Sequence, residues 1–259
     1  MQFNKKALLP IEYPDLIRLG KHNDGGYVVP KSAIDNVNLL LTFGVANDWS
    51  FEQDFRKLNP TARIDAYDHT IGESIYSDIK YSSLVGSVVS LGMFKPKEAL
   101  EQLNKSSDYV DHKKRYREFF NTENNAFHYQ LRIARRGDEY SISPYELFNH
   151  LLAENPDVSI FLKIDIEGAE YEVMEQILTF SKSIKAIAIE CHECDRKRDF
   201  DKMINSMKKE FSIVHIHANN YGPVNEYHDF PAYLEITLVN NSCLVESASI
   251  DRFSTKTYP

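Results

Sequence analysis

Acidic side chains follow directly after an apolar run in the middle of the chain. The run covers residues 158–164 and ends at Asp165, with Glu167 shortly after it. An amphipathic helical pattern comes next, and its apolar face consists of Val173, Met174, Ile177 and Leu178. Open α/β sheets build ligand sites where a strand ends and a helix begins. We therefore interpret Asp165 and Glu167 as part of a binding site, in preference to an ordinary surface turn.

Gly44 and Asp68 form a second constellation. Gly44 follows an apolar run, and Asp68 comes 24 residues later, at the end of the next strand pattern. A glycine lets the backbone approach a ligand closely, and an acidic side chain at about this spacing can reach ribose hydroxyls. The loop GVANDWS lacks the repeated glycines that accommodate a pyrophosphate. The pattern favours a cofactor with adenine and ribose but no pyrophosphate, such as S-adenosylmethionine, whose positive charges Asp48 and Glu52 could pair.

A sheet must position these residues, and the chain alternates strand and helix patterns from about residue 38 onward. Such alternation predicts an α/β fold with a mostly parallel sheet. The last two strands should form an antiparallel pair at its edge. The expected strands are 38–45, 63–67, 127–134, 158–164, 184–189, 211–216 and 233–239.

Two helix starts carry capping signals. Ser50 and Gln53 are spaced as a capping box, and Ser143 precedes both a proline and Glu146. A serine cap with Glu or Gln three residues later satisfies two backbone N–H groups at a helix start. We expect helices to begin at both serines.

Two regions fall outside the alternation. The segment from about residue 10 to about residue 35 contains a DGGY turn signal between two short β-prone runs. This pattern predicts a hairpin arm. The segment from about residue 71 to about residue 126 is too long for a simple crossover between two strands. We therefore expect a helical insertion there. We expect one domain over residues 1–259.

The composition argues against several partners. The net charge of −8 disfavours nucleic acid or an anionic membrane as the main partner. No apolar stretch of about 18 residues is present to span a bilayer. Cys191 and Cys194 lie in a CHEC cluster, but a zinc site needs a second pair and only Cys243 remains. We expect free thiols and a cytoplasmic protein.

Several motifs together resemble one known family. KIDIEGAE at 163–170 and IAIECHE at 187–193, with the Gly44 loop and Asp68, resemble the FkbM family of S-adenosylmethionine-dependent O-methyltransferases. RLGKHNDGGYVV at 18–29 is similar to a subset of that family with an N-terminal DGGY arm. The resemblance covers roughly residues 15–70 and 127–240. It implies a Rossmann-like class I methyltransferase sheet with helices on both faces.

The resemblance also implies cofactor contacts. The residues that it places near S-adenosylmethionine are Gly25, Gly26, Tyr27, Gly44 and Asp68. Asp48 and Asp165 join them as carboxylates that could pair with the positive charges of the cofactor. The chain departs from the common class I pattern at two positions. Thr42 stands where an acidic residue is usual, and Ala46 stands where a second glycine is usual. The DGGY arm could supply contacts that this loop lacks.

Methyl transfer to a hydroxyl group requires the acceptor oxygen, the methyl carbon and the sulfur to lie in line. A positioned base raises the rate of such a step by about 10²–10⁴-fold. Polar residues at three strand ends are candidates. Our first candidate for the base is His192, because a neutral imidazole accepts a proton near pH 7. Asp165 or Glu190 could orient His192 or act as the base in its place. His217, Asn219 and Glu167 are candidates for substrate contacts, although loop-stabilising roles are equally open for the first two.

The family resemblance and the polar cluster at the strand ends together imply methyl transfer to a sugar hydroxyl, with the sugar nucleotide-activated or glycan-linked, as in polysaccharide or capsule biosynthesis. A metal-dependent hydrolase is one alternative, but it would leave the Gly44 loop and Asp68 without a role. A non-catalytic module is another, because Thr42 and Ala46 depart from the usual pattern. Asp165, Glu190 and His192 could also bind a divalent cation. The spacing of these three residues matches no metal motif, so we assign no metal ligand. The oligomeric state does not follow from the sequence.

Overall fold

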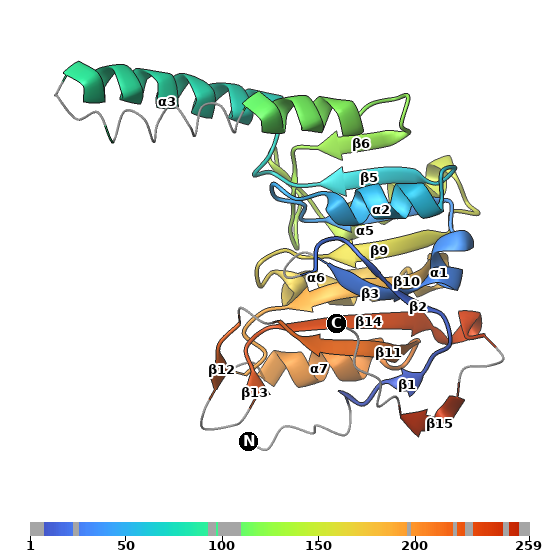
Figure 1. Cartoon of the computed structure of the whole chain (residues 1–259). Helices are drawn as coiled ribbons and strands as arrows, with labels where there is room; N and C mark the ends of the chain where they lie inside the picture. Colours follow the sequence, from blue (N-terminus) through green and yellow to red (C-terminus); the bar gives the residue numbers. More distant parts are fainter. Residues whose placement is uncertain are drawn as a thin grey trace.

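The computed structural model describes residues 8–22, 26–92, 97, 110–195, 198–219, 222–225, 230–245 and 249–253. Its centre is a seven-stranded sheet (Figure 1). In spatial order the strands are β11 (Phe211–Ala218), β14 (Leu234–Asn240), β10 (Ile184–Cys191), β9 (Ile160–Ile164), β4 (Leu39–Phe43), β5 (Arg63–Tyr67) and β6 (Ala126–Tyr129).

The sheet is parallel except at one edge. Strands β4, β5, β6, β9 and β10 run parallel to their neighbours, and β14 is antiparallel to both β10 and β11. The prediction of a mostly parallel sheet with an antiparallel C-terminal edge is confirmed. From β4 the chain moves outward to β5 and β6, then crosses to β9 on the other side of β4. This reversal makes the space beyond β4 and β9 a topological switch point, where such sheets bind ligands.

Strand β4 is buried on both faces because it lies in the middle of the sheet. Its alternate residues enter two separate apolar cores: Leu39, Leu41 and Phe43 join one, and Leu40 joins the other. This division follows from the two-residue period of a strand. Both cores are closed by helices, as the amphipathic patterns predicted.

The helices divide between the two cores. Apolar residues of α5 (Pro144–Glu154), α6 (Glu170–Leu178) and α7 (Arg198–Met207) pack into the core that contains Leu39. Residues of α1 (Lys31–Asp35) and α2 (Ser50–Leu58) pack into the other core. The sheet therefore has helices on both faces, as the Rossmann-like expectation requires.

The capping prediction is confirmed for one helix and wrong for the other. The side chain of Ser143 accepts a hydrogen bond from the Glu146 N–H, and the Glu146 carboxylate accepts one from the Ser143 N–H, which completes a capping box for α5. Helix α2 has no such box, because the carboxylate of Asp48 accepts the Ser50 N–H at 3.1 Å. The hydroxyl of Ser50 is buried without a hydrogen-bond partner.

The strand expected over residues 127–134 is divided by a turn. Strand β6 ends at Tyr129, whose carbonyl accepts the Leu131 N–H at 2.8 Å. The chain then leaves the sheet, and β7 (Arg132–Ile133) pairs with β8 (Ser141–Ile142) instead. This change of direction carries residues 131–133 over the carboxyl end of the sheet.

Two segments lie outside the central sheet. Strands β2 (Leu16–Leu19) and β3 (Tyr27–Pro30) form an antiparallel hairpin at the position expected for an arm, and residues 23–25 at its tip lie outside the described residues. Between β5 and β6 come α3 (Glu73–Gly92), which projects past the β6 edge in Figure 1, and helical residues 110–119. Within the described ranges, no helix is long and apolar enough to cross a membrane.

The remaining short elements lie near the two chain ends and the C-terminal edge. They are β1 (Ile11–Glu12), β12 (Val224–Asn225), β13 (Phe230–Pro231), β15 (Ser249–Phe253) and the 3-10 turns η2 (Ser181–Ser183) and η3 (Asn241–Cys243). Strand β1 pairs with β15, and β12 pairs with β13.

Candidate active site at the carboxyl ends of the strands

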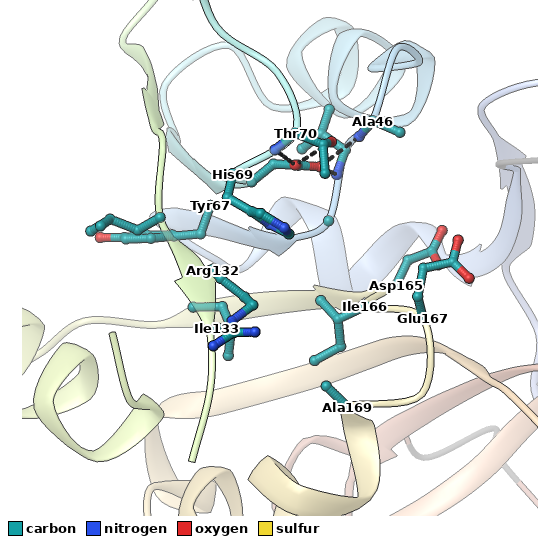
Figure 2. Close-up of a pocket in the computed structure, with 14 residues that line it drawn as sticks. Ala46, Tyr67, His69, Thr70, Arg132, Ile133, Asp165, Ile166, Glu167 and Ala169 are labelled. Carbon is teal, nitrogen blue, oxygen red and sulfur yellow. Dashed lines mark hydrogen bonds between the residues drawn. The ribbon is translucent and has the colours of Figure 1, made fainter. Parts of the chain in front are cut away.

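A cavity of about 280 Å³ opens at the carboxyl ends of β4, β5 and β9 (Figure 2). Its walls come from residues 44–46, 67–70, 131–133 and 165–167, together with Ala169. The strand register explains this convergence, because Phe43 pairs with both Tyr67 and Ile164. Gly44, Asp68 and Asp165 therefore leave the sheet at the same level. The cavity occupies the topological switch point.

Gly44 is required by the close approach of two chain segments. Its φ is +80°, a conformation that favours glycine, and a Cβ there would lie 1.7 Å from the carbonyl oxygen of Asp165. The Asp165 N–H donates to the carbonyl of Phe43 at 2.8 Å, which holds the two segments together. Gly44 thus lines the cavity, where the sequence pattern placed a ligand-facing glycine.

Asp68 also lies at the cavity wall, but its carboxylate binds the protein itself. One oxygen accepts the N–H groups of Val45 and Ala46 at 2.8 and 2.7 Å, and the other accepts the N–H and the hydroxyl of Thr70, both at 2.6 Å. Burial alone would raise the pKa of Asp68, but these hydrogen bonds outweigh it and hold the pKa below its ordinary value. Asp68 therefore fixes the Gly44 loop as an ionised side chain.

Replacing Asp68 with asparagine should lower the free energy of unfolding at pH 7 by about 1–3 kcal/mol, because the amide keeps only one of the two acceptor oxygens and turns an NH₂ group toward the donors of the other. Since the folded pKa lies below the unfolded one, the carboxylate stabilises the fold above about pH 4 and loses this effect as the pH falls through the folded value. The gap between wild type and Asp68→Asn should therefore shrink in acid. Urea unfolding at several pH values measures it, and a gap that widens in acid would contradict the assignment.

Beside the cavity lies a cluster of Asp165, Glu190 and His192. One oxygen of each carboxylate and one ring nitrogen all lie within 4.8 Å of one another. Asp165 follows β9, while Glu190 is in β10, one residue past the pairing of Ile189 with Ile164. Adjacent parallel strands thus bring the two carboxylates together. Asp165 belongs both to this cluster and to the cavity wall.

His192 is held between two carboxylates. Its Nδ1 lies 2.9 Å from the Glu170 carboxylate, and its Nε2 lies 3.5 Å from that of Glu167. Burial alone would lower the pKa of His192, but the hydrogen bond to Glu170 and the charges of Glu170, Glu190 and Asp165 outweigh it and raise the pKa to about 9. The expectation of a neutral imidazole near pH 7 is therefore wrong for the ligand-free protein, because the sequence pattern did not show Glu170 as its partner.

Other predicted site residues support the same cluster. The hydroxyl of Tyr27 in the hairpin donates to Asp165 at 3.3 Å, and the side-chain amide of Asn219 donates to Glu190 at 2.9 Å. Both side chains are buried. Glu167 lines the cavity beside Asp165, on the side away from Tyr67 and Arg132 (Figure 2).

Four predicted residues are not brought into the cavity wall or the cluster by any described contact. Asp48 pairs with Lys21 at 3.0 Å and accepts the Ser50 N–H. Gly26 packs within the hairpin, where a Cβ would lie 2.0 Å from the Lys21 carbonyl oxygen. His217 lies on β11 opposite Glu235, and burial lowers its pKa. Gly25 lies outside the described residues.

Two supporting residues were missed by the sequence analysis. Glu170 is fully buried and stands in the KIDIEGAE motif, where the sequence analysis gave it no role of its own. Lys163 is buried within β9; its ammonium group donates to the Gly44 carbonyl at 3.1 Å and lies 3.8 Å from the buried Glu52 carboxylate. The presence of a lysine inside an otherwise apolar strand pattern was the feature of the sequence that could have indicated this buried ion pair.

The fold and the position of the cavity define a Rossmann-like class I methyltransferase architecture. The chain belongs to the FkbM methyltransferase family, since the family model described as "Methyltransferase FkbM domain" matches residues 22–222. The resemblance inferred from the motifs is confirmed at this level. A search of curated proteins found no match.

Solved structures show weaker similarity. One is a precorrin-6y C5,15-methyltransferase from Geobacter metallireducens, 10% identical over 80% of this chain and 83% of that chain, with a TM-score of 0.38. Another is a SAM-dependent O-methyltransferase from Thermotoga maritima, 9% identical over 80% of this chain and 60% of that one, with a TM-score of 0.34. Similarities this weak carry no conclusion about substrate or mechanism.

Proposed function

We propose that this methyltransferase uses S-adenosylmethionine and methylates a hydroxyl group of a sugar that is nucleotide-activated or glycan-linked. One observation carries the proposal. Asp165 lines the cavity and also belongs to the cluster with Glu190 and His192, so a donor site and a polar acceptor site share a wall. This arrangement suits the transfer of a group between two bound molecules.

The cavity has the chemistry that the cofactor requires. Gly44 lines the cavity, and the loop fixed by Asp68 presents no glycine-rich cradle for a pyrophosphate. Asp165 and Glu167 at the rim can attract a sulfonium and an ammonium group. Gly44, Tyr67 and Asp68 would contact the adenosyl part. When bound, S-adenosylmethionine supplies an electrophilic methyl group.

The acceptor oxygen would form a bond to the methyl carbon as the carbon–sulfur bond breaks, and the cofactor would leave as S-adenosylhomocysteine. The hydroxyl proton would pass to a carboxylate at the rim, where Asp165 and Glu167 both line the cavity. Without a bound cation, His192 is charged and would donate one hydrogen bond to the acceptor from Nε2, because its Nδ1 already faces Glu170. Carboxylates together with the amide of Asn219 suit the hydroxyl groups of a sugar.

The acceptor class is tested with cofactor carrying a radiolabelled methyl group. We expect the full chain to label at least one member of a panel of nucleotide sugars and glycan oligosaccharides, with the label recovered as an O-methyl sugar after acid hydrolysis. Panels of amines and thiols serve as controls. Transfer to these alone would contradict the proposed acceptor.

A further inference from the structure

We propose that Asp165, Glu190 and His192 bind one divalent metal cation; its catalytic role rests on the proposed function, although its binding does not. The three ligand-type atoms lie within 4.8 Å of one another. Two ligands of one cation, each about 2.0–2.3 Å from it, are separated by at most about 4.6 Å. Three atoms with separations of at most 4.8 Å all lie within about 2.8 Å of a common point, so side-chain shifts of about half an ångström to one ångström would bring all three to bonding distance.

The orientation of His192 is that of a metal ligand. Its Nδ1 lies 2.9 Å from the Glu170 carboxylate, so that Nε2 is the nitrogen presented to the other side. Histidines that bind metals almost always donate their second ring N–H to a carboxylate or carbonyl group, which fixes the tautomer and the ring. His192 is only 8% exposed, and its ring packs against Tyr233 at 5.1 Å. The imidazole is thus set in place before any ligand arrives.

Both carboxylates of the cluster are also oriented from outside it. The Tyr27 hydroxyl donates to one oxygen of Asp165 at 3.3 Å, and the Asn219 amide donates to one oxygen of Glu190 at 2.9 Å. Tyr27 and Asn219 are themselves 1% and 7% exposed, so these partners are held by packing. Partners of this kind orient ligating groups in metal sites.

A buried charge beside the cluster points to the same ligand. Glu170 is 0% exposed, and its second carboxylate oxygen has no hydrogen-bond partner. Burying a carboxylate is costly unless its charge is compensated. Glu167 adds a fourth carboxylate on the solvent side of the cluster, 3.5 Å from His192 Nε2 and 88% exposed. A cation would offset this concentration of negative charge.

The donor set selects the class of metal. Carboxylate oxygens suit Mg²⁺ and Mn²⁺, while imidazole nitrogen favours transition metals, so Mn²⁺ suits both kinds of ligand. Three protein ligands leave positions open for water and for the acceptor hydroxyl. A bound cation lowers the pKa of that hydroxyl, and Glu167 would then take the proton while Asp165 serves as a ligand.

The test is a titration of the full chain, stripped of metal with EDTA, with Mn²⁺ followed by electron paramagnetic resonance of the free ion. We expect one Mn²⁺ per chain. Glu190→Gln and His192→Gln should weaken binding at least tenfold, and Glu170→Gln by about 10–100-fold, since it removes the partner of a ligand. Glu172→Gln is the matched control, because it makes the same change at an exposed position of α6 and should leave affinity unchanged.

Absence of binding by wild-type protein at millimolar Mn²⁺ would overturn the inference, as would equal affinity in wild type and all folded variants. The wild-type titration decides the matter even where a buried variant does not fold. Calorimetry with S-adenosylhomocysteine on the same preparation separates the two proposals. Mn²⁺ binding without nucleoside binding would support the cation site and overturn the proposed function, and the reverse result would overturn the cation site alone.

Discussion

Asp165→Asn should lower the turnover number for methyl transfer by about 10²–10⁴-fold, the usual size of acid–base catalysis at a hydroxyl group, because Asp165 either takes the proton or holds the cation that makes the hydroxyl acidic. The substitution keeps the size of the side chain but removes the charge that lines the cavity and completes the cluster. The dissociation constant for S-adenosylhomocysteine should change less than tenfold, since a single half-exposed charge contact contributes roughly 0–1 kcal/mol. Single-turnover kinetics and calorimetry measure the two effects.

Asp157→Asn is the matched control for this variant. Asp157 is exposed near the opposite end of β9, so the same chemical change there should affect neither quantity. A turnover number for Asp165→Asn within threefold of wild type would contradict the assignment. A large loss of cofactor affinity with normal turnover at saturation would place Asp165 in the donor site alone.

Gly44→Ala should remove measurable cofactor binding and destabilise the fold. A Cβ at this position would lie 1.7 Å from the Asp165 carbonyl oxygen, and φ is +80°. Overpacking of this kind costs about 1–3 kcal/mol, and the left-handed conformation adds about 1–2 kcal/mol for alanine. The two strand ends would have to separate, which changes the cavity wall. Urea unfolding and calorimetry with S-adenosylhomocysteine measure both losses.

Ala46→Gly is the companion variant in the same loop. Ala46 has a φ of 48°, so glycine would relieve backbone strain at this position. Glycine would also raise the conformational entropy of the unfolded chain, which opposes that gain in stability. We expect the free energy of unfolding to change by less than about 1 kcal/mol, with binding retained. Equal effects of the two substitutions would show that the loop responds to any change, and that close approach at Gly44 is not the cause.

The sheet could be predicted because its strands are short apolar runs buried on both faces, as in β4 and β9. The division of residues 127–134 could not, since no glycine or proline marks the turn after Tyr129. Two candidate caps stand close together before α2, and sequence spacing favoured Ser50 although the Asp48 carboxylate accepts its N–H. Competition between neighbouring polar groups is resolved only by geometry.

The meeting of Asp165 with Glu190 was predictable, because both lie at the carboxyl ends of predicted parallel strands. The charge state of His192 could not be predicted from the sequence. It depends on Glu170, which a turn with positive φ at Glu167 and Gly168 brings back toward β10. The inward position of Lys163 was likewise hidden, since an alternating pattern is absent from a strand buried on both faces.

A crystal structure of the full chain with S-adenosylhomocysteine would show where the donor binds. We expect the nucleoside in the cavity at the ends of β4, β5 and β9, with its sulfur on the side of Asp165, Glu190 and His192. Density for the ligand elsewhere, such as in the cavity of about 340 Å³ lined by Met174, Lys202 and Met203, would contradict this expectation.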